Sequence, residues 1–367
     1  MTVPKAGCKS VRVSVSSTTI PSASMIQVPT RTLLKTILKT LLKIIFKLWK
    51  WASSFVVVFF FAAWFYGGVL PYLIFVAAFL SLSYHITDYF LYQPDMPSDS
   101  RLFVESPARY TMHFEDVWIH TKDRVKIHGY LIKQNRLSNR NVPTIIFFHG
   151  NAGNIGHRLE NVKLFYYQLN CNVLMVEYRG YGRSEGSPSE KGLYADAQAA
   201  FEYIDSREDL DSKKVILFGR SLGGAVAIDL AARCDFRDRV AGLIVENTFT
   251  SIPAIAKELF KFAILKWVPN FCYKNRFESL QKIGSVACPT LFISGTNDEL
   301  LPPTMSNELY AKCSAGTKFL HRFPGGHNDT WICKEYIPKI SEFIEEEVVA
   351  GTRNSTAKYQ AYSDNIV

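Results

Sequence analysis

The sequence contains few cysteines, and none of them has the spacing expected of a metal site. Seven cysteines are scattered through 367 residues, and no two form a Cys-x-x-Cys pair. Structural zinc usually requires such pairs, so we expect no zinc. Disulfides would require an oxidising location, such as the lumen of the secretory pathway.

The first 50 residues contain no acidic side chain. They carry nine Lys or Arg, whereas the other 317 residues carry 33 basic and 33 acidic side chains. The net charge of +9 therefore belongs to the N-terminal segment. Because the remainder offers no basic surface for phosphates, we do not expect a nucleic-acid partner.

Two regions are distinguished within this N-terminal segment. Residues 1–31 are rich in Ser and Thr and lack apolar periodicity, which predicts a disordered tail. In residues 32–50, lysines recur every four positions between Leu and Ile. This spacing predicts a basic amphipathic helix on an anionic bilayer surface. The alternative is a helix with a solvated basic face.

Charged residues are also absent from Trp51 to Thr87. About 20 apolar residues cross a bilayer, so we expect a transmembrane helix with an aromatic interfacial continuation within 51–92. Gly67, Gly68 and Pro71 allow a hairpin as the alternative. Each half of such a hairpin would span roughly 24 Å, short of the ~30 Å core, so the single span is favoured.

The basic N-terminus predicts the orientation of this span. Positive flanks stay in the cytosol, so a single pass makes the segment a type II signal anchor with a lumenal or extracellular C-terminal domain. Asn328 and Asn354 lie in glycosylation sequons that would matter in that location. A hairpin would instead leave the domain cytosolic.

Residues 110–350 alternate between strand and helix patterns, which predicts a mostly parallel sheet flanked by helices. Residues 250–285 interrupt this alternation, either as a cap over the site or as a surface helix pair. Residues 351–367 form a polar C-terminal tail. The expected strands are 125–132, 144–148, 173–177, 215–218, 242–246, 290–294 and 318–323, and the expected helices 158–169, 194–206, 224–233 and 336–348.

The serine at position 221 follows the apolar run 215–218 in the sequence Gly-Arg-Ser-Leu-Gly and precedes a helical pattern. A strand, a Gly-x-Ser-x-Gly turn and a helix form a nucleophile elbow, in which the serine hydroxyl stands above the sheet edge. The alternative is a glycine-rich turn without chemistry. We predict that Ser221 is a catalytic nucleophile.

A serine nucleophile needs a base and an acid that orients the base. Asp298 follows the strand pattern 290–294, and His327 follows 318–323 behind two glycines. The ends of parallel strands meet at one sheet edge, where ligands bind. We therefore predict Asp298 as the acid and His327 as the base, with Glu246 as the rival acid.

The oxyanion hole requires two backbone N–H donors. We expect Leu222, after the nucleophile, and Asn151, in the His-Gly-Asn-Ala-Gly-Asn sequence after strand 144–148. A phosphate-binding loop is not expected there, because no Lys-Ser/Thr follows. Residues 177–184 are expected to support the site.

These motifs resemble the Bem46-like branch of the α/β-hydrolase superfamily. The resemblance rests on His-Gly-Asn-Ala-Gly-Asn at 149–154, Tyr-Arg-Gly-Tyr-Gly at 178–182 and Gly-Arg-Ser-Leu-Gly-Gly at 219–224. It implies an α/β-hydrolase fold after an N-terminal transmembrane helix, a triad at Ser221, Asp298 and His327, and no cofactor.

The resemblance implies serine hydrolase chemistry but no particular substrate. Because the ordered triad follows a membrane anchor that would keep the site close to lipid, we predict an esterase or thioesterase that acts on acylated or lipid substrates, including palmitoyl-proteins. Related depalmitoylases use an N-terminal cysteine cluster, whereas only Cys8 precedes residue 171 here. One alternative is a serine peptidase of the oligopeptidase type. Another is a non-catalytic, membrane-anchored binding module.

Overall fold

The structure is a computed structural model, and it describes residues 54–350 apart from 66, 68, 135–141 and 260–268. The predicted disordered tail (1–31), the basic helix (32–50), the C-terminal tail (351–367) and Asn354 lie outside these described residues. The chain divides into two compact units, Met1–Ala77 and Ala78–Val367. The second unit thus includes residues before position 110, where we expected the catalytic domain to begin.

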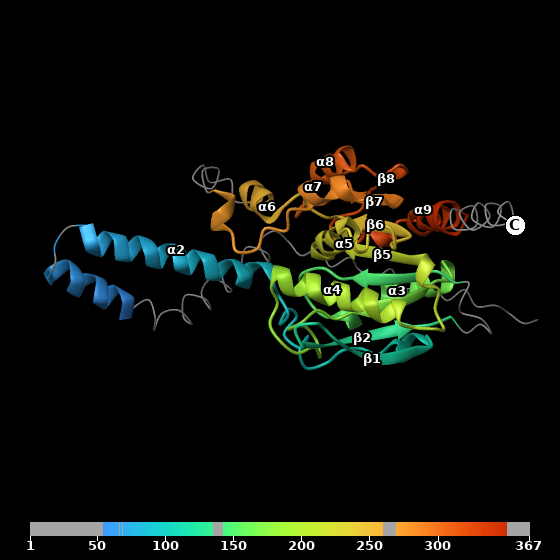
Figure 1. The fold of residues 1–367 in the computed structure, drawn as a ribbon, viewed down its shortest axis with the longest axis horizontal. Coiled ribbons are helices and arrows are strands. Elements are labelled where there is room, and N and C mark those ends of the chain that lie inside the picture. Colours follow the sequence, from blue (N-terminus) through green and yellow to red (C-terminus); the bar gives the residue numbers. More distant parts are fainter. Residues whose placement is uncertain (1–53, 66, 68, 135–141, 260–268, 351–367) are drawn as a thin grey trace, which may run out of the picture. The chain divides into compact units, whose positions relative to one another are not determined.

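Two helices form the described part of the first unit, residues 54–65 and the beginning of α2 (Val69–Leu91) (Figure 1). Between them Gly67 has φ +43°, and its N–H donates to Ala63 O at 3.2 Å. A left-handed glycine of this kind ends a helix. The rings of Phe59 and Phe75 lie 5.6 Å apart, so the two helices pack as a hairpin.

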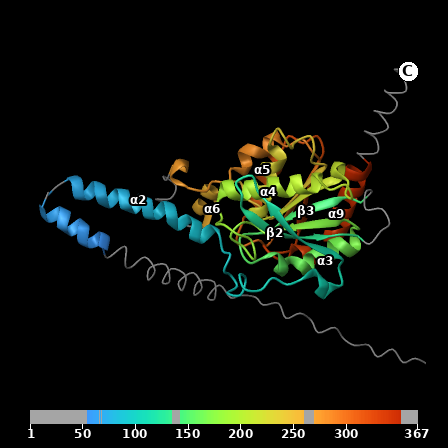
Figure 2. The same ribbon diagram turned by 60° about the horizontal axis from the view of Figure 1, so that its bottom comes forward.

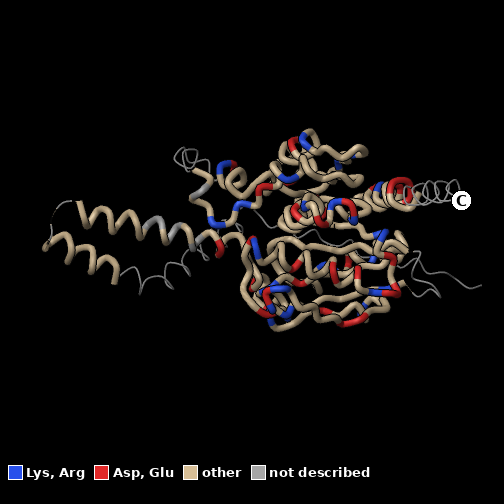
Figure 3. The backbone as a smooth tube through the Cα atoms, viewed as in Figure 1, with Lys and Arg blue, Asp and Glu red and all other residues tan. Residues whose placement is uncertain are grey.

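The transmembrane helix expected within 51–92 is interrupted in the described residues, because the first helix ends at the left-handed Gly67. In the part of the chain that the structure describes, no helix has the length and hydrophobicity needed to cross a membrane. The described residues up to Thr87 carry no Lys, Arg, Asp or Glu, whereas the second unit has both signs interspersed (Figure 3).

The second unit is built on a sheet of eight strands in the order β1-β2-β4-β3-β5-β6-β7-β8. The first two strands pair antiparallel, and β3 to β8 pair parallel. This confirms the mostly parallel sheet. The strands are β1 (Phe114–His120), β2 (Lys126–Ile132), β3 (Thr144–Phe148), β4 (Asn172–Val176), β5 (Val215–Arg220), β6 (Gly242–Glu246), β7 (Thr290–Gly295) and β8 (Lys318–Phe323).

Helices cover both faces of this sheet (Figure 2). The α-helices after α2 are α3 (Leu159–Gln168), α4 (Glu190–Asp205), α5 (Leu222–Ala232), α6 (Ile252–Leu259), α7 (Ser279–Lys282), α8 (Pro303–Lys312) and α9 (Tyr336–Phe343), the last continuing as a π-helical turn, Ile344–Val349. Of these, α4 and α5 lie on one face and α3 and α9 on the other. Short 3-10 helices are Pro107–Tyr110, Ile155–Arg158, Ser212–Lys214, Asn270–Cys272, Ile283–Ser285 and Thr330–Ile332.

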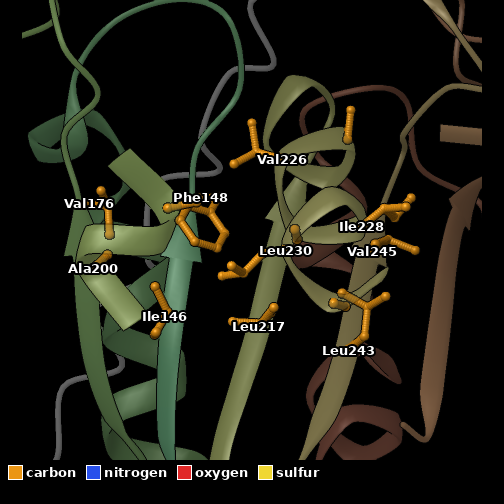
Figure 4. Packing of buried hydrophobic residues seen from close by; sticks show 14 of the residues in the cluster. Ile146, Phe148, Val176, Ala200, Leu217, Val226, Ile228, Leu230, Leu243 and Val245 are labelled. Carbon is orange, nitrogen blue, oxygen red and sulfur yellow. The ribbon is translucent and has the colours of Figure 1, made fainter. Parts of the chain in front are cut away.

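Alternate residues of the central strands pack on opposite faces of the sheet. Ile146 and Leu217 belong to the cluster that includes α4 and α5 (Figure 4). Ile145 and Phe218 belong to the cluster with α3 and α9. Burial on both faces explains why these strands read as continuous apolar runs. Since β3 to β8 are parallel, their carboxyl ends meet at one edge, where the predicted site residues follow.

Candidate active site

Ser221 lies at the turn between β5 and α5 with φ +54° and ψ −117°. A non-glycine residue in this region costs about 1–3 kcal/mol and persists only where the surroundings hold it. A Cβ atom on Gly219 would lie 2.2 Å from Gly223 O, and one on Gly223 would lie 2.1 Å from Phe148 O. Both glycines are therefore required by the close approach of α5 to the strand ends.

The structure brings the three predicted triad side chains together from three loops. His327 Nε2 lies 3.1 Å from Ser221 Oγ, and His327 Nδ1 lies 2.7 Å from Asp298 Oδ2. The other carboxylate oxygen, Oδ1, accepts from the N–H groups of Leu300 and Leu301 at 2.9 and 2.8 Å. This geometry allows the imidazole to accept the serine proton while the carboxylate fixes the ring orientation.

Asn247 connects the two loops that carry the acid and the base. Its Nδ2 donates to His327 O at 3.0 Å, to Gly326 O at 3.2 Å and to Thr330 Oγ1 at 2.9 Å. Its Oδ1 accepts from Gly295 N–H at 2.7 Å. The sequence reasoning missed this residue, although its place directly after β6, between the strands that precede the serine and the acid, was a usable signal.

The rival acid, Glu246, is buried in a separate network. It accepts hydrogen bonds from Arg220 at 3.0 Å and from Thr330 and Tyr336 at 2.8 Å each. Burial tends to lower the pKa of Arg220, but the carboxylate beside it outweighs burial, and the pKa is raised. The Glu246 carboxylate therefore neutralises a buried guanidinium, whereas the carboxylate hydrogen-bonded to the imidazole of His327 is that of Asp298.

The two predicted oxyanion donors flank the serine. The oxyanion loop, residues 149–153, follows β3, and a Cβ atom on Gly150 would lie 3.7 Å from Ser221 Cβ. Among the described residues, no hydrogen-bond acceptor is seen for the N–H of Asn151 or of Leu222. Both donors are thus available to a negative oxygen formed at the serine.

Residues after β4 support this loop, as the sequence predicted. Tyr178 Oη donates to His149 O at 3.0 Å, and Tyr181 Oη donates to Asn151 O at 2.8 Å. Burial raises the pKa of both phenols, so they act as donors. The buried imidazole of His149 lies 3.2 Å from Glu177, in a geometry too poorly aligned for a good hydrogen bond.

Two further features concern glycosylation and metal binding. Asn328, a predicted glycosylation site, directly follows the base and is exposed. Within the described ranges, no group of three or more His, Cys, Asp or Glu residues is arranged to hold a metal ion.

Comparisons with known proteins agree with this fold. The family described as serine aminopeptidase S33 (Hydrolase_4) matches residues 139–287. Protein bem46 of Schizosaccharomyces pombe is 39% identical over 259 residues, 70% of this chain and 85% of that protein. The Saccharomyces cerevisiae protein named "uncharacterized membrane protein YNL320W" is 36% identical over 266 residues, 72% of this chain and 90% of that protein.

A solved structure shows the same fold. The esterase Pf2001 of Pyrococcus furiosus matches with a TM-score of 0.55 and 21% identity, over 67% of this chain and 98% of that chain. At this identity the likeness concerns the fold alone. Together with the sequence relationship to bem46, the eight-stranded sheet and the matched hydrolase family identify this protein. The chain belongs to the Bem46-like branch of the α/β-hydrolase superfamily.

Proposed function

We propose that the protein is a membrane-anchored serine hydrolase that cleaves acyl esters or thioesters. The observation that carries the proposal is the hydrogen-bonded series from Ser221 Oγ through His327 to Asp298, at 3.1 and 2.7 Å. A binding module has no physical need for this arrangement on a strained nucleophile elbow.

The proposed reaction has two halves. Ser221 Oγ attacks the acyl carbonyl while His327 Nε2 accepts its proton, and the N–H groups of Asn151 and Leu222 stabilise the oxyanion. The intermediate collapses to an acyl-serine, and the imidazolium gives its proton to the leaving alcohol or thiol. Water then attacks the acyl-serine by the same route, which releases the acid and restores the serine.

Acyl hydrolysis is tested with the full chain in detergent or vesicles. Long-chain acyl thioesters, including a palmitoylated peptide, and a 4-nitrophenyl ester should be hydrolysed, and Ser221→Ala should lower kcat by at least about 10⁴-fold. Equal turnover by the variant would contradict the proposal. Absence of hydrolysis by a folded wild type would contradict it as well.

A serine peptidase is the second candidate, and the description of the matched family as serine aminopeptidase favours it. A peptidase must protonate an amine leaving group, which the same imidazole can do. Short aminopeptidase substrates should be assayed beside the thioesters. A higher kcat/KM on the peptides would replace the esterase assignment.

We also propose that the hairpin of residues 54–65 and α2 attaches the enzyme to a lipid bilayer. Trp64 is 87% exposed and Phe60 66% exposed, with Val57, Phe61, Phe65 and Val69 similarly open. Apolar surface of this kind marks a membrane or protein contact. The lysines of residues 32–50 favour an anionic lipid surface, and one relative is named a membrane protein.

The two proposed topologies differ in a measurable way. A hairpin would leave both ends on the cytosolic side, so Asn328 and Asn354 would remain unmodified. The type II single pass would expose both sequons to glycosylation. Endoglycosidase treatment of the cell-expressed chain should leave its mobility unchanged, and a shift that disappears in Asn328→Gln or Asn354→Gln would contradict the hairpin.

A further inference from the structure

The oxyanion loop has no regular secondary structure, yet each of its first four carbonyl groups accepts a hydrogen bond. Glycines at 150 and 153 make its backbone intrinsically free, so these bonds must define its conformation. The donors are Tyr178 Oη to His149 O, His149 Nδ1 to Gly150 O, Tyr181 Oη and Gln93 N to Asn151 O, and Arg158 Nη2 to Ala152 O.

One of these donors comes from an unexpected part of the chain. Gln93 N–H donates to Asn151 O at 2.9 Å, and Gly153 N–H donates back to Gln93 O at 3.4 Å. Gln93 and Ala152 form an isolated parallel β-bridge. A residue just after α2 therefore adds a two-sided backbone clamp to the oxyanion loop.

The clamp is itself fixed to the hydrolase unit on its N-terminal side. Tyr92 is buried, and its hydroxyl donates to Asn275 Oδ1 at 3.0 Å. Asp88 pairs with Lys274 and accepts from Asn275 Nδ2 at 2.5 Å. The segment from Asp88 to Gln93 is thus held at both ends, which gives the clamp a defined position.

Oxyanion stabilisation is sensitive to small displacements of the donor. A misplacement of about 1 Å can cost about 100-fold in rate. The Asn151 N–H belongs to the peptide between Gly150 and Asn151, whose carbonyl accepts from His149 Nδ1. The next peptide, which carries Asn151 O, is joined to it at the Asn151 Cα, so bonds that hold Asn151 O limit the torsions about this Cα and with them the direction of the N–H. Because Asn151 O accepts from both Gln93 N–H and Tyr181 Oη, rotation of the Asn151–Ala152 peptide would break two hydrogen bonds.

We propose that the backbone of Gln93 is a positioning element for the oxyanion hole, so that the segment leaving α2 forms part of the catalytic machinery. Its kinetic consequence rests on the proposed hydrolase function; its structural consequence does not. Gln93 touches neither the serine nor the imidazole, and it acts through the Asn151 peptide.

The test is Gln93→Pro in the full chain. Proline removes the N–H donor. Because Pro94 follows, residue 93 already favours an extended backbone, a conformation that proline can adopt. We expect kcat to fall about 10- to 100-fold while KM stays within about twofold, because only the transition state needs the donor. Affinity for an alkylboronic acid, which forms a tetrahedral adduct, should fall in parallel.

Gln93→Ala is the matched comparison. It keeps both backbone bonds and removes only the side-chain amide, which donates to Phe90 O at 3.4 Å and to Tyr89 O near the end of α2. Its loss of kcat should be about threefold or less. Equal losses in the two variants would assign the effect to the helix end and would overturn the proposal, as would an unchanged kcat in folded Gln93→Pro.

Hydrogen exchange separates this proposal from the hydrolase assignment. In Gln93→Pro the hydrogen-bonded amides of residues 153–155 should exchange at least about tenfold faster than in wild type, whereas Ser221→Ala should leave them unchanged. This readout holds even if no substrate is turned over. Unchanged exchange in the proline variant would contradict the clamp.

Discussion

The two halves of the candidate site are held in place by different parts of the chain. The acid and base loops are joined by Asn247 and lie against the Glu246 network, both from the middle of the hydrolase unit. The oxyanion loop is held by Tyr178 and Tyr181 and by Gln93, which lies 58 positions before Asn151. The triad loops are therefore held by residues at the strand ends. The oxyanion loop depends in addition on a segment that lies before residue 110, outside the catalytic domain expected from the sequence.

This difference has a physical basis. The triad needs three side chains with fixed mutual distances, and the ends of neighbouring parallel strands provide them directly. The oxyanion hole needs two backbone donors, whose direction depends on loop torsions rather than on side-chain identity. Such donors require external restraint, and any adjacent segment can supply it.

Removing the carboxylate of the triad should produce the largest effect. Asp298→Asn keeps an oxygen for the Leu300 and Leu301 amides but favours the wrong imidazole tautomer, so kcat should fall about 10⁴-fold, as in serine proteases. Thermal unfolding should shift little. Activity within tenfold of wild type would show that the carboxylate does not orient the base.

The sequence predicted the triad positions and the parallel strands well, because both leave clear patterns at and before the strand ends. Ser221, Asp298 and His327 each follow an apolar strand, and the structure brings all three within hydrogen-bonding reach. The parallel strands were predictable because burial on both faces gives continuous apolar runs. Edge strand β1 was missed because Glu115 and Asp116 interrupt its apolar alternation.

Other features were not predictable from patterns within one segment. The bonds of Gln93 arise from a long-range approach of two backbones, which leaves no mark on side-chain type. The length of each half, roughly 24 Å against a ~30 Å bilayer core, favours a single span over a hairpin. Segment length does not reveal that Gly67 adopts a left-handed conformation, which ends the first helix.

Glu246→Gln tests whether the neighbouring network is structural. The variant leaves the buried Arg220 without its counter-ion, so the free energy of unfolding should fall by about 3–5 kcal/mol. Denaturant unfolding measures this loss. The folded fraction should keep kcat within about tenfold of wild type, and a loss comparable to that of Asp298→Asn would make Glu246 the acid.

Asn247→Asp tests whether Asn247 holds the loops that carry the acid and the base. Aspartate tolerates the left-handed backbone of this residue, at φ +46°, and still accepts from Gly295 N–H. It cannot donate to His327 O, so we expect kcat to fall about 10- to 100-fold. Asn328→Asp, at an exposed position in the loop that carries His327, is the matched control. Equal effects in the two variants would indicate a charge effect rather than lost loop support.

Tyr181→Phe and Tyr178→Phe should give the smallest effects. Each removes one hydrogen bond to the oxyanion loop, worth about 1 kcal/mol, and Asn151 O keeps its bond to Gln93 in the first variant. We expect kcat to fall about three- to fivefold with KM unchanged. The double variant Tyr181→Phe with Gln93→Pro should lose more than the sum of the single free-energy losses. Additive losses would show that the two donors act independently.

The most direct measurement of the central claim is covalent labelling of the full chain with a fluorophosphonate, followed by peptide mass spectrometry. The account predicts one adduct on Ser221 Oγ in the wild type, no adduct in Ser221→Ala and much slower labelling in His327→Ala. A folded wild type that is not labelled, or a label that persists in Ser221→Ala, would contradict it.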